Sequence, residues 1–304
     1  MSVLVVGSLN MDLVVTMKRF PKSGETVTAE DLTLVPGGKG LNQAVAAARL
    51  VSNVSFFGAV GTDGYADTLQ AALIDAGADI SYLQKVVGSS GVALIEVEES
   101  GNNRISIVPG ANKEFVFDQS LLQKVKDSNY SVLLAPLENP ILEVEESFRV
   151  AKEAGMTTIL NPAPYQHLNS KFLSLVDILI PNQHEASLMT GSIISNKEEA
   201  IPAARKLLSA GHKSVIITLG KEGAVFVSEA EVLFQEAFKV DTVDTTAAGD
   251  VFCAAFAAQI SLGASNKVAL KFASAAAAIS TTKLGASISA PTHQAVDTYL
   301  KRFE

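Results

Sequence analysis

The sequence predicts an α/β fold, a doubly wound and mostly parallel sheet with helices on both faces and a small β-sheet lid. Short apolar runs alternate with stretches whose apolar residues recur at helical spacing, which is typical of such sheets. The chain has no Trp and only 6% aromatic residues, and aliphatic residues are the usual material of buried parallel strands. Its 304 residues are enough for a sizeable core, and we expect one domain over residues 1–304.

Six apolar runs are predicted strands, and four stretches between them are predicted helices. The strands are expected at residues 3–6, 54–57, 132–135, 157–160, 177–180 and 215–219. The helices are expected at residues 41–50, 66–76, 142–154 and 198–210. Two Ala-rich helices, over about 247–261 and 265–282, and a last helix after residue 291 complete the chain.

Two regions interrupt this alternation. Residues 12–35 contain β-type runs at 13–16, 26–28 and 32–35 without a helix between them. Residues 91–108 are typical of a hairpin, with runs at 92–97 and 104–108 on either side of a polar turn. Both regions are predicted to form antiparallel strands of a small side sheet. Because they interrupt the large domain, we expect this sheet to be a lid over its active face.

Composition and charge exclude several classes of partner. The net charge is −8 and no block of Lys or Arg stands out, so nucleic acid and anionic membranes are poor candidates. No apolar stretch approaches the roughly 18 residues of a membrane span, and no basic leader opens the chain, so we expect a cytoplasmic protein. The single cysteine, Cys253, lies in an apolar run and is predicted to be a buried, inert thiol.

The most informative segment covers residues 240–256, where a polar stretch leads into an apolar helix. Its junction consists of Ala247, Ala248, Gly249 and Asp250. Small residues at a helix start leave backbone N–H groups unpaired and sterically open, which creates a pocket for an anion. An Asp at this position is favoured by the helix dipole and can act as a base beside a bound anion. The alternative is that Asp250 serves only as a helix cap.

A second candidate segment is the glycine-rich turn over residues 36–43, which opens the first long helix. It is not a Walker A loop, because that motif needs a Gly where Thr33 stands and a Ser or Thr where Gly40 stands. Residues 7–10 lack the glycine fingerprint of a dinucleotide fold, which argues against a dehydrogenase. We expect Lys39 and Asn42 to point at a polyhydroxylated ligand. A plain connector with an exposed lysine is the alternative.

Further polar residues follow predicted strands, at the sheet edge where ligands of open α/β folds bind. Asn10 and Asp12 follow the first strand, and Asn182 and Glu185 follow the strand at 177–180. The second pair can organise Mg²⁺ near phosphates, because hard cations prefer oxygen ligands, but its spacing is also that of a helix capping box. The Gly-bounded turn at 218–223 is either an ordinary hairpin or a place where backbone approaches a nucleotide.

Taken together and in this order, these segments resemble the ribokinase-type, or pfkB, carbohydrate kinases. The two recurring motifs of that family are similar to GGKGLNQ at 37–43 and DTTAAGD at 244–250, and the likeness runs from residue 3 to about 291. The resemblance implies an ATP-dependent kinase that phosphorylates the 5-hydroxyl of D-ribose to give ribose 5-phosphate and ADP. It also implies a homodimer formed by pairing two lids.

The resemblance implies roles for individual residues as well. Asp250 would deprotonate the sugar hydroxyl, and the amides of Ala247, Ala248 and Gly249 would form the anion hole. The sugar would be bound by Asn10, Asp12, Gly38, Lys39, Asn42 and Glu138 together with Asp250. ATP would be bound by Asn182, Thr218, Gly220, Gly223, Gly249 and Ser274. Asn182 and Glu185 would organise Mg²⁺, and K⁺ would lie near Asp244, Thr246, Ser280, Lys283, Gly285 and Ser289.

Other substrates and one other class of protein remain open. Family members that act on deoxyribose, fructose, a sugar phosphate or a nucleoside are alternatives. Asn10 argues against 2-deoxyribose, because a site lacking the 2-hydroxyl would leave a polar residue there unpaired. A sugar phosphate would call for more Lys or Arg than Lys39 alone. A non-catalytic sugar-binding regulator would be expected to lack Asp250 or its small neighbours, and both are present.

Overall fold

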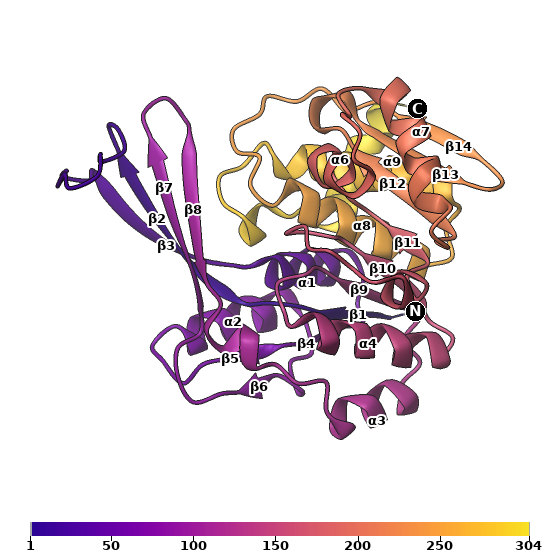
Figure 1. Cartoon of the computed structure of the whole chain (residues 1–304), viewed down its shortest axis with the longest axis horizontal. Helices are drawn as coiled ribbons and strands as arrows, with labels where there is room; N and C mark the ends of the chain where they lie inside the picture. The colour runs from indigo at the N-terminus through magenta and orange to yellow at the C-terminus, as the bar shows by residue number, and fades with distance from the viewer. Residues whose placement is uncertain (1, 304) are drawn as a thin grey trace.

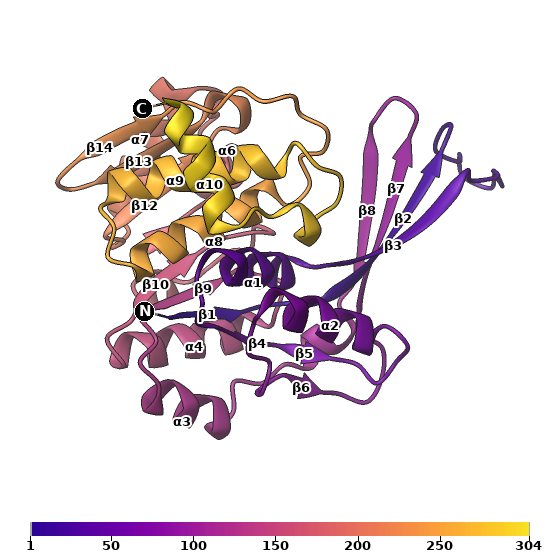
Figure 2. The same cartoon turned by 180° about the vertical axis from the view of Figure 1, so that it is seen from behind.

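The computed structural model describes residues 2–303 and shows a central sheet between two layers of helices, with a second sheet projecting from the body (Figures 1 and 2). The central sheet has eight strands. In spatial order they are β14 (Val232–Gln235), β13 (Ala224–Ser228), β12 (Ser214–Thr218), β11 (Ile178–Leu179), β10 (Thr157–Leu160), β9 (Val132–Ala135), β1 (Val3–Val6) and β4 (Val54–Phe57). The strands from β12 to β4 pair in parallel, and β13 and β14 are antiparallel. The predicted fold class is confirmed.

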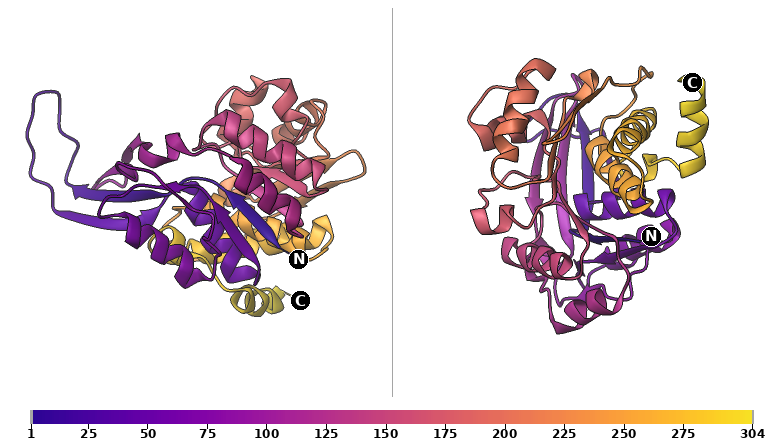
Figure 3. Two further views of the ribbon diagram at one scale, coloured as in Figure 1. Left: turned by 90° about the horizontal axis from the view of Figure 1, so that it is seen from below. Right: turned by 90° about the vertical axis from the view of Figure 1, so that its right-hand side faces the viewer.

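Each face of this sheet is covered by its own set of helices, as the edge-on view in Figure 3 shows. Successive residues of β1 point to opposite faces, so that Val3 and Val5 join one buried cluster and Leu4 and Val6 join the other. The first cluster is covered by α1 (Lys39–Leu50), α2 (Ala66–Ala76), α8 (Ala248–Ser261), α9 (Asn266–Ser280) and α10 (His293–Leu300). The second is covered by α3 (Gln119–Asp127), α4 (Ile141–Glu153), α5 (Ser170–Leu173), α6 (Gln183–Thr190) and α7 (Lys197–Leu208).

The projecting sheet has four strands in the order β3 (Asp31–Gly37), β2 (Asn10–Met17), β7 (Gly91–Glu98) and β8 (Asn103–Val108). The outer pairs, β2–β3 and β7–β8, are antiparallel, whereas the central pair β2–β7 is parallel. The sheet is therefore mixed, and the prediction of antiparallel strands throughout was wrong at its centre. A short parallel pair, β5 (Ala59–Val60) with β6 (Gln84–Lys85), lies apart from both sheets.

Several predicted bounds differ from the structure by one or two residues, and two differences have a physical reason. Residues 26–28 belong to no strand. Their β-branched residues favour extended backbone, but this segment has no neighbouring strand with which its backbone can pair. Helix α1 begins at Lys39, two residues before the predicted start. Gly38 has a φ of 90°, so the backbone turns sharply there and the helix can start immediately after it.

The helices and the single cysteine bear on two further predictions. No helix between residues 2 and 303 is long and apolar enough to cross a bilayer. Cys253 is buried in α8, and burial raises the pKa of its thiol well above the usual value. A neutral thiol is a poor nucleophile, which agrees with the prediction of an inert cysteine.

Candidate active site

The carboxyl ends of five parallel strands converge on one region of the molecule. Residues 8–10 follow β1, Glu138 lies beyond β9, and Asn161 follows β10 directly. Asn182 lies beyond β11, and Thr218 ends β12. Open α/β sheets bind ligands at this edge, because the loops there leave a crevice between the strand ends and the helices.

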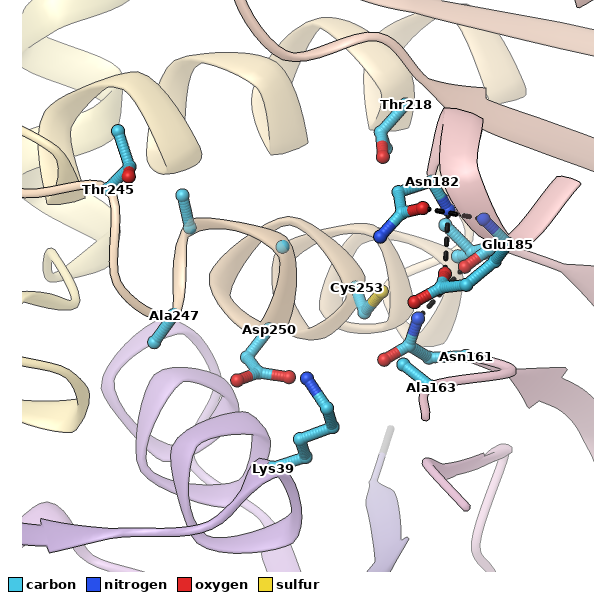
Figure 4. A pocket seen from close by; sticks show the side chains of 13 residues that line it. Lys39, Asn161, Ala163, Asn182, Glu185, Thr218, Thr245, Ala247, Asp250 and Cys253 are labelled. Carbon is cyan, nitrogen blue, oxygen red and sulfur yellow. Dashed lines mark hydrogen bonds between the residues drawn. The ribbon is translucent and has the colours of Figure 1, made fainter. Parts of the chain in front are cut away.

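A pocket of about 200 Å³ lies at this edge, with the N-terminus of α8 as one wall (Figure 4). It brings together candidate residues that are more than 200 positions apart in the sequence, among them Lys39 and Asp250. Its lining consists of Lys39, Asn161, Ala163, Ile180, Asn182, Glu185, Thr218, Thr245, Ala247, Ala248, Gly249, Asp250 and Cys253.

The N-terminus of α8 has the open amides that the sequence predicts, with one exception. Ala247 caps the helix in the left-handed conformation, with φ 59° and ψ 7°. Within residues 2–303 the amides of Ala247 and Gly249 have no hydrogen-bond acceptor, whereas the amide of Ala248 donates to the carbonyl of Thr245 at 3.2 Å. A Cβ placed on Gly249 would meet nothing within 4 Å. This helix end therefore offers an anion free donors and open space.

Asp250 lies in the first turn of α8, 5% exposed. Its Oδ2 accepts a hydrogen bond from Asn42 Nδ2 at 3.1 Å, and its Oδ1 accepts one from Gln43 Nε2 at 3.1 Å. Burial raises the pKa of Asp250, while the charge of Lys39 and the two amide donors oppose that rise. The carboxyl group is thus desolvated and held by two amide donors, and it makes no helix-capping hydrogen bond.

Lys39 completes this charge arrangement. Its side chain and that of Asp250 point toward one another in Figure 4. The negative charge of Asp250 raises the pKa of Lys39, so the ammonium group stays protonated although it is removed from water. The backbone amide of Lys39 donates to Glu138 Oε2 at 3.0 Å, and the hydroxyl of Ser8 donates to the same oxygen. Glu138 therefore ties the start of α1 to the loop after β1.

Asn10 and Asp12 lie at the base of the projecting sheet, on strand β2. Asn10 Oδ1 accepts a hydrogen bond from Asn112 Nδ2 at 2.8 Å. This contact leaves the side-chain amino group of Asn10 to donate to a ligand. Burial, together with the charges of Glu138 and Asp250, raises the pKa of Asp12 to about 7. The protonated form of Asp12 is therefore favoured much more than in a solvated carboxyl group, and in that form Asp12 can donate a hydrogen bond.

Sequence reasoning missed several residues of this region. Asn112 lies in a 3₁₀ turn more than 100 residues from Asn10, and no sequence pattern marks it. Ile95 and Ile105 were also missed. Ile95 pairs with Val14 on β2, and Ile105 pairs with Ile95. Because alternate residues of a strand share a face, both isoleucines lie on the sheet face of Asn10 and Asp12. Alternation along the predicted hairpin would have placed them on one face, but only the pairing of β2 with β7 shows which face it is.

Asn182 and Glu185 form a capping box at the start of α6, as their spacing suggested. Asn182 Oδ1 accepts from the amide of Glu185 at 2.8 Å, and Glu185 Oε2 accepts from the amide of Asn182 at 2.8 Å. Both residues also line the pocket. The box fixes one polar atom of each side chain and leaves Asn182 Nδ2 and Glu185 Oε1 for a ligand. Burial raises the pKa of Glu185.

The other residues predicted to bind ATP are more dispersed. Thr218 lines the pocket. Gly220 begins the 3₁₀ turn that joins β12 to β13, Gly223 follows that turn, and both lie outside the pocket lining. Gly223 has a φ of 115°, and a Cβ there would lie 2.0 Å from the carbonyl oxygen of Gln235. Ser274 is in α9, where its hydroxyl is buried and has no hydrogen-bond partner among residues 2–303.

The residues expected near K⁺ come from two segments joined by Asp244. Its Oδ1 accepts from the amide and hydroxyl of Thr246, and its Oδ2 accepts from the amide of Gly285 at 2.9 Å. Burial acts to raise the pKa of Asp244, but these hydrogen bonds outweigh it and hold the pKa below its usual value. The hydroxyls of Ser280 and Ser289 donate to carbonyls of their own turns.

No cluster of three or more His, Cys, Asp or Glu side chains that could hold a metal occurs in the part of the chain that the structure describes. Asp244 is the one carboxylate among the residues expected near K⁺, and both of its oxygens accept hydrogen bonds. Some nearby carbonyls already have a cationic partner, because Arg49 Nη1 donates to those of Ser287, Ile288 and Ala290 at 3.3, 2.9 and 2.7 Å. Arg49 belongs to the last turn of α1, so it ties that helix to the 287–290 turn.

Phosphoryl transfer to a hydroxyl group depends on a base at the acceptor oxygen and on positive charge where negative charge develops, and both are present where the strands end. The fold and the site therefore define a small-molecule kinase. More particularly, the chain belongs to the pfkB family of carbohydrate kinases, because the profile of that family matches residues 1–293.

Three relatives illustrate the likeness. A ribokinase of Haemophilus influenzae is 39% identical over 294 residues, which cover 95% of this chain and 95% of the relative. A deoxyribokinase of Salmonella typhi is 34% identical over 303 residues, 99% of each chain. The solved structure of Arabidopsis thaliana ribokinase complexed with ribose and ATP matches with a TM-score of 0.92 at 33% identity, and covers 99% of this chain and 98% of that one.

Proposed function

We propose that this kinase transfers the γ-phosphoryl group of ATP to the 5-hydroxyl of D-ribose, giving ribose 5-phosphate and ADP. Similarity to ribokinases over nearly the whole chain supports this substrate pair, including one relative whose structure holds ribose and ATP. The observation that carries the proposal is the placement of Asp250, a buried carboxylate beside the open amides of a helix N-terminus and inside the pocket.

Asp250 acts as the base in this reaction. It accepts the proton of the 5-hydroxyl as the sugar oxygen forms its bond to the γ-phosphorus and the bond to the β,γ-bridging oxygen of ATP breaks. Negative charge on the γ-phosphoryl oxygens is met by the amides of Ala247 and Gly249 and by the ammonium of Lys39. Ala248 contributes a small side chain rather than a donor, because its amide already has an acceptor. These groups are fixed before the reaction, so little reorganisation accompanies it.

The sugar lies between α1 and the base of the projecting sheet. Asn10 presents its amino group and Asp12 its carboxyl group to ring hydroxyls, and Lys39 and Asn42 bind from α1. The Oδ1 atom of Asn42 is buried and has no hydrogen-bond partner in the described structure, so it is available to accept from a sugar hydroxyl. Gly38 and Glu138 shape the floor, and Ile95 and Ile105 provide an apolar wall on the sheet face that they share with Asp12.

ATP lies along the carboxyl ends of β11 and β12, with its terminal phosphates at α8. Asn182, Glu185 and Gly249 face the phosphates, while Thr218, Gly220, Gly223 and Ser274 lie toward the nucleoside. Glu185 Oε1 offers Mg²⁺ the oxygen ligand that this cation prefers, and Asn182 Nδ2 can donate to a phosphate oxygen beside it. When bound, Mg²⁺ supplies charge that draws electrons from the transferring group.

K⁺ and a homodimer belong to the same proposal. K⁺ binds beside Asp244, Thr246, Ser280, Lys283, Gly285 and Ser289, through carbonyl oxygens that Asp244 orders by joining the two segments. The projecting sheet serves as the lid and exposes large apolar side chains, a surface typical of a contact with another chain. They are Leu32, Leu34 and Leu94, which share the sheet face opposite Asp12 because Leu34 and Leu94 both pair with Leu13. Two lids pair through this surface.

The role of Asp250 is tested by the variant Asp250→Asn, which keeps the side chain's shape and removes the base. We expect turnover in a coupled ADP-release assay to fall at least 10³-fold, in the upper part of the range for loss of a general base, while calorimetry still detects sugar binding. Turnover within tenfold of the unaltered protein would refute the base assignment.

The sugar is tested by the same assay with ribose, 2-deoxyribose, fructose and a nucleoside, each in K⁺ and in Na⁺. We expect ribose to give the highest kcat/KM, and K⁺ to support more activity than Na⁺. The similarity to a deoxyribokinase makes 2-deoxyribose the sharpest competitor. A higher kcat/KM for 2-deoxyribose would overturn the substrate and leave the kinase assignment standing.

A further inference from the structure

Gln43 lies behind the base, between Asp250 and the wall of the pocket. It belongs to the second turn of α1 and is completely buried. Both hydrogens of its amino group are used, because Nε2 donates to Asp250 Oδ1 at 3.1 Å and to Asn161 Oδ1 at 3.2 Å. Gln43 therefore joins the α8 carboxylate to the residue that follows β10.

The orientation of this chain of side chains is fixed from one end. Asn161 Nδ2 donates to the backbone carbonyl of Ile180 at 3.0 Å, and a carbonyl oxygen can only accept. Asn161 must therefore turn its Oδ1 toward Gln43, and Gln43 must present its amino group. The flipped amide of Gln43 would place its oxygen against two other oxygens, so the network admits one arrangement.

The buried oxygen of the Gln43 amide argues that packing alone does not explain this residue. Gln43 Oε1 is shielded from solvent and has no hydrogen-bond partner in the described part of the chain. Leaving a buried polar atom unpaired costs free energy, and an apolar side chain of similar length would fill the space without that cost. The amino group must therefore contribute something that outweighs the unpaired oxygen.

We propose that Gln43 is the positioning residue of the base: it fixes the plane of the Asp250 carboxylate through Oδ1 and favours its ionised form. The inference rests on the proposed role of Asp250 as the base. Asn42 holds the other carboxylate oxygen, but it is 6% exposed and reaches the sugar as well. Gln43 is completely buried, so it acts on the reaction through the two side chains that it holds, Asp250 and Asn161, of which Asp250 is the proposed base.

The electrostatics of the site agree with this role. Burial raises the pKa of Asp250, and the hydrogen bonds from Asn42 and Gln43 are among the interactions that counter it. Removing the donor at Oδ1 would raise that pKa further and leave the carboxylate free to rotate about its last bond. Both effects lower the rate of proton transfer, and the first also moves the pH at which the base becomes ionised.

The test is the variant Gln43→Met, which keeps the length of the side chain and removes both donors. The matched control is Gln259→Met, which alters another buried glutamine on α8 whose contact is to His293. We expect Gln43→Met to lower kcat roughly 10- to 100-fold, as for loss of one hydrogen bond to a charged group. The KM for ribose should stay unchanged, and the acid limb of the kcat profile should move to higher pH. Gln259→Met should change none of these.

The inference is overturned if Gln43→Met keeps the acid limb at its original pH, or if its loss appears in KM and not in kcat. Should this variant fail to fold, as judged by circular dichroism, Gln43→Glu decides instead. It preserves the shape but sets a second carboxyl group against Asp250, so the acid limb must move to higher pH. Turnover by Asp250→Asn would refute the base itself, whereas an inactive Asp250→Asn beside a normal Gln43→Met refutes only the role of Gln43.

Discussion

Asp12 carries a carboxyl group whose charge the folded protein disfavours, and this makes a measurable prediction for Asp12→Asn. Burial, with the charges of Glu138 and Asp250, raises its pKa from the usual 3.8 to about 7. One pKa unit corresponds to about 1.4 kcal/mol, so this shift corresponds to about 4 kcal/mol as an upper limit. Above pH 7 the ionised Asp12 therefore lowers the free energy of unfolding by up to that amount relative to a neutral side chain.

The pH dependence follows from the direction of the shift. Between pH 3.8 and pH 7 the folded protein holds more of this proton than the unfolded chain does, so the contribution of Asp12 to stability falls as pH rises through that window. Above the window it is constant. Asp12→Asn removes the titration, and we expect it to raise the free energy of unfolding by up to about 4 kcal/mol at pH 8 and by about 2 kcal/mol at pH 5.5.

The measurement is urea unfolding at both pH values, followed by circular dichroism because the chain has no Trp. Asp31→Asn on the same sheet is the control, since Asp31 is exposed and should change stability little at either pH. Turnover with ribose should fall in Asp12→Asn. The unaltered protein keeps this destabilising carboxylate because it binds the sugar, and the variant loses that contact. A variant no more stable than the unaltered protein at pH 8, or equally stabilised at both pH values, would refute the reasoning.

Two further predictions concern residues that hold the site in shape. Asn112→Ala frees the side chain of Asn10, and we expect the KM for ribose to rise roughly tenfold in the coupled assay, with the preference over 2-deoxyribose reduced; an unchanged KM would contradict it. Gly223→Ala combines a left-handed φ with a clash against Gln235, and we expect it to lower the free energy of unfolding by at least about 2 kcal/mol. Gly64→Ala, where a Cβ meets nothing, is its control in urea unfolding, and similar losses in both variants would contradict the argument.

The fold was predictable from the sequence because its signals are local. The strands at 3–6 and 54–57 and the helix at 66–76 have the predicted bounds, since apolar runs and helical spacing are properties of neighbouring residues. The parallel pairing of β2 with β7 was not predictable, because it joins segments about 80 residues apart and depends on how the intervening chain packs. Residues 26–28 show a different limit of local signals. Their β-branched residues favour a strand, but no neighbouring strand lies beside them, so no strand forms.

The site also contains residues that local sequence signals identified and partners that they could not identify. The small residues before Asp250 and the glycine-rich turn before Lys39 identified two elements that the structure brings into one pocket. The partners of those side chains could not be found, because hydrogen bonds such as Asn112 to Asn10 cross more than 100 residues and leave no spacing to detect. The occupied amide of Ala248 was equally hidden, since it depends on the turn geometry before α8.

Helix α1 has a consequence for communication within the molecule. Its first two turns carry Lys39, Asn42 and Gln43, which lie against Asp250. Its last turn carries Arg49, which donates hydrogen bonds to three carbonyls of the 287–290 segment. Twelve residues at 1.5 Å per residue make a rod of about 18 Å. One helix therefore connects the 287–290 segment directly to the amide donors that hold Asp250, without passing through the sheet.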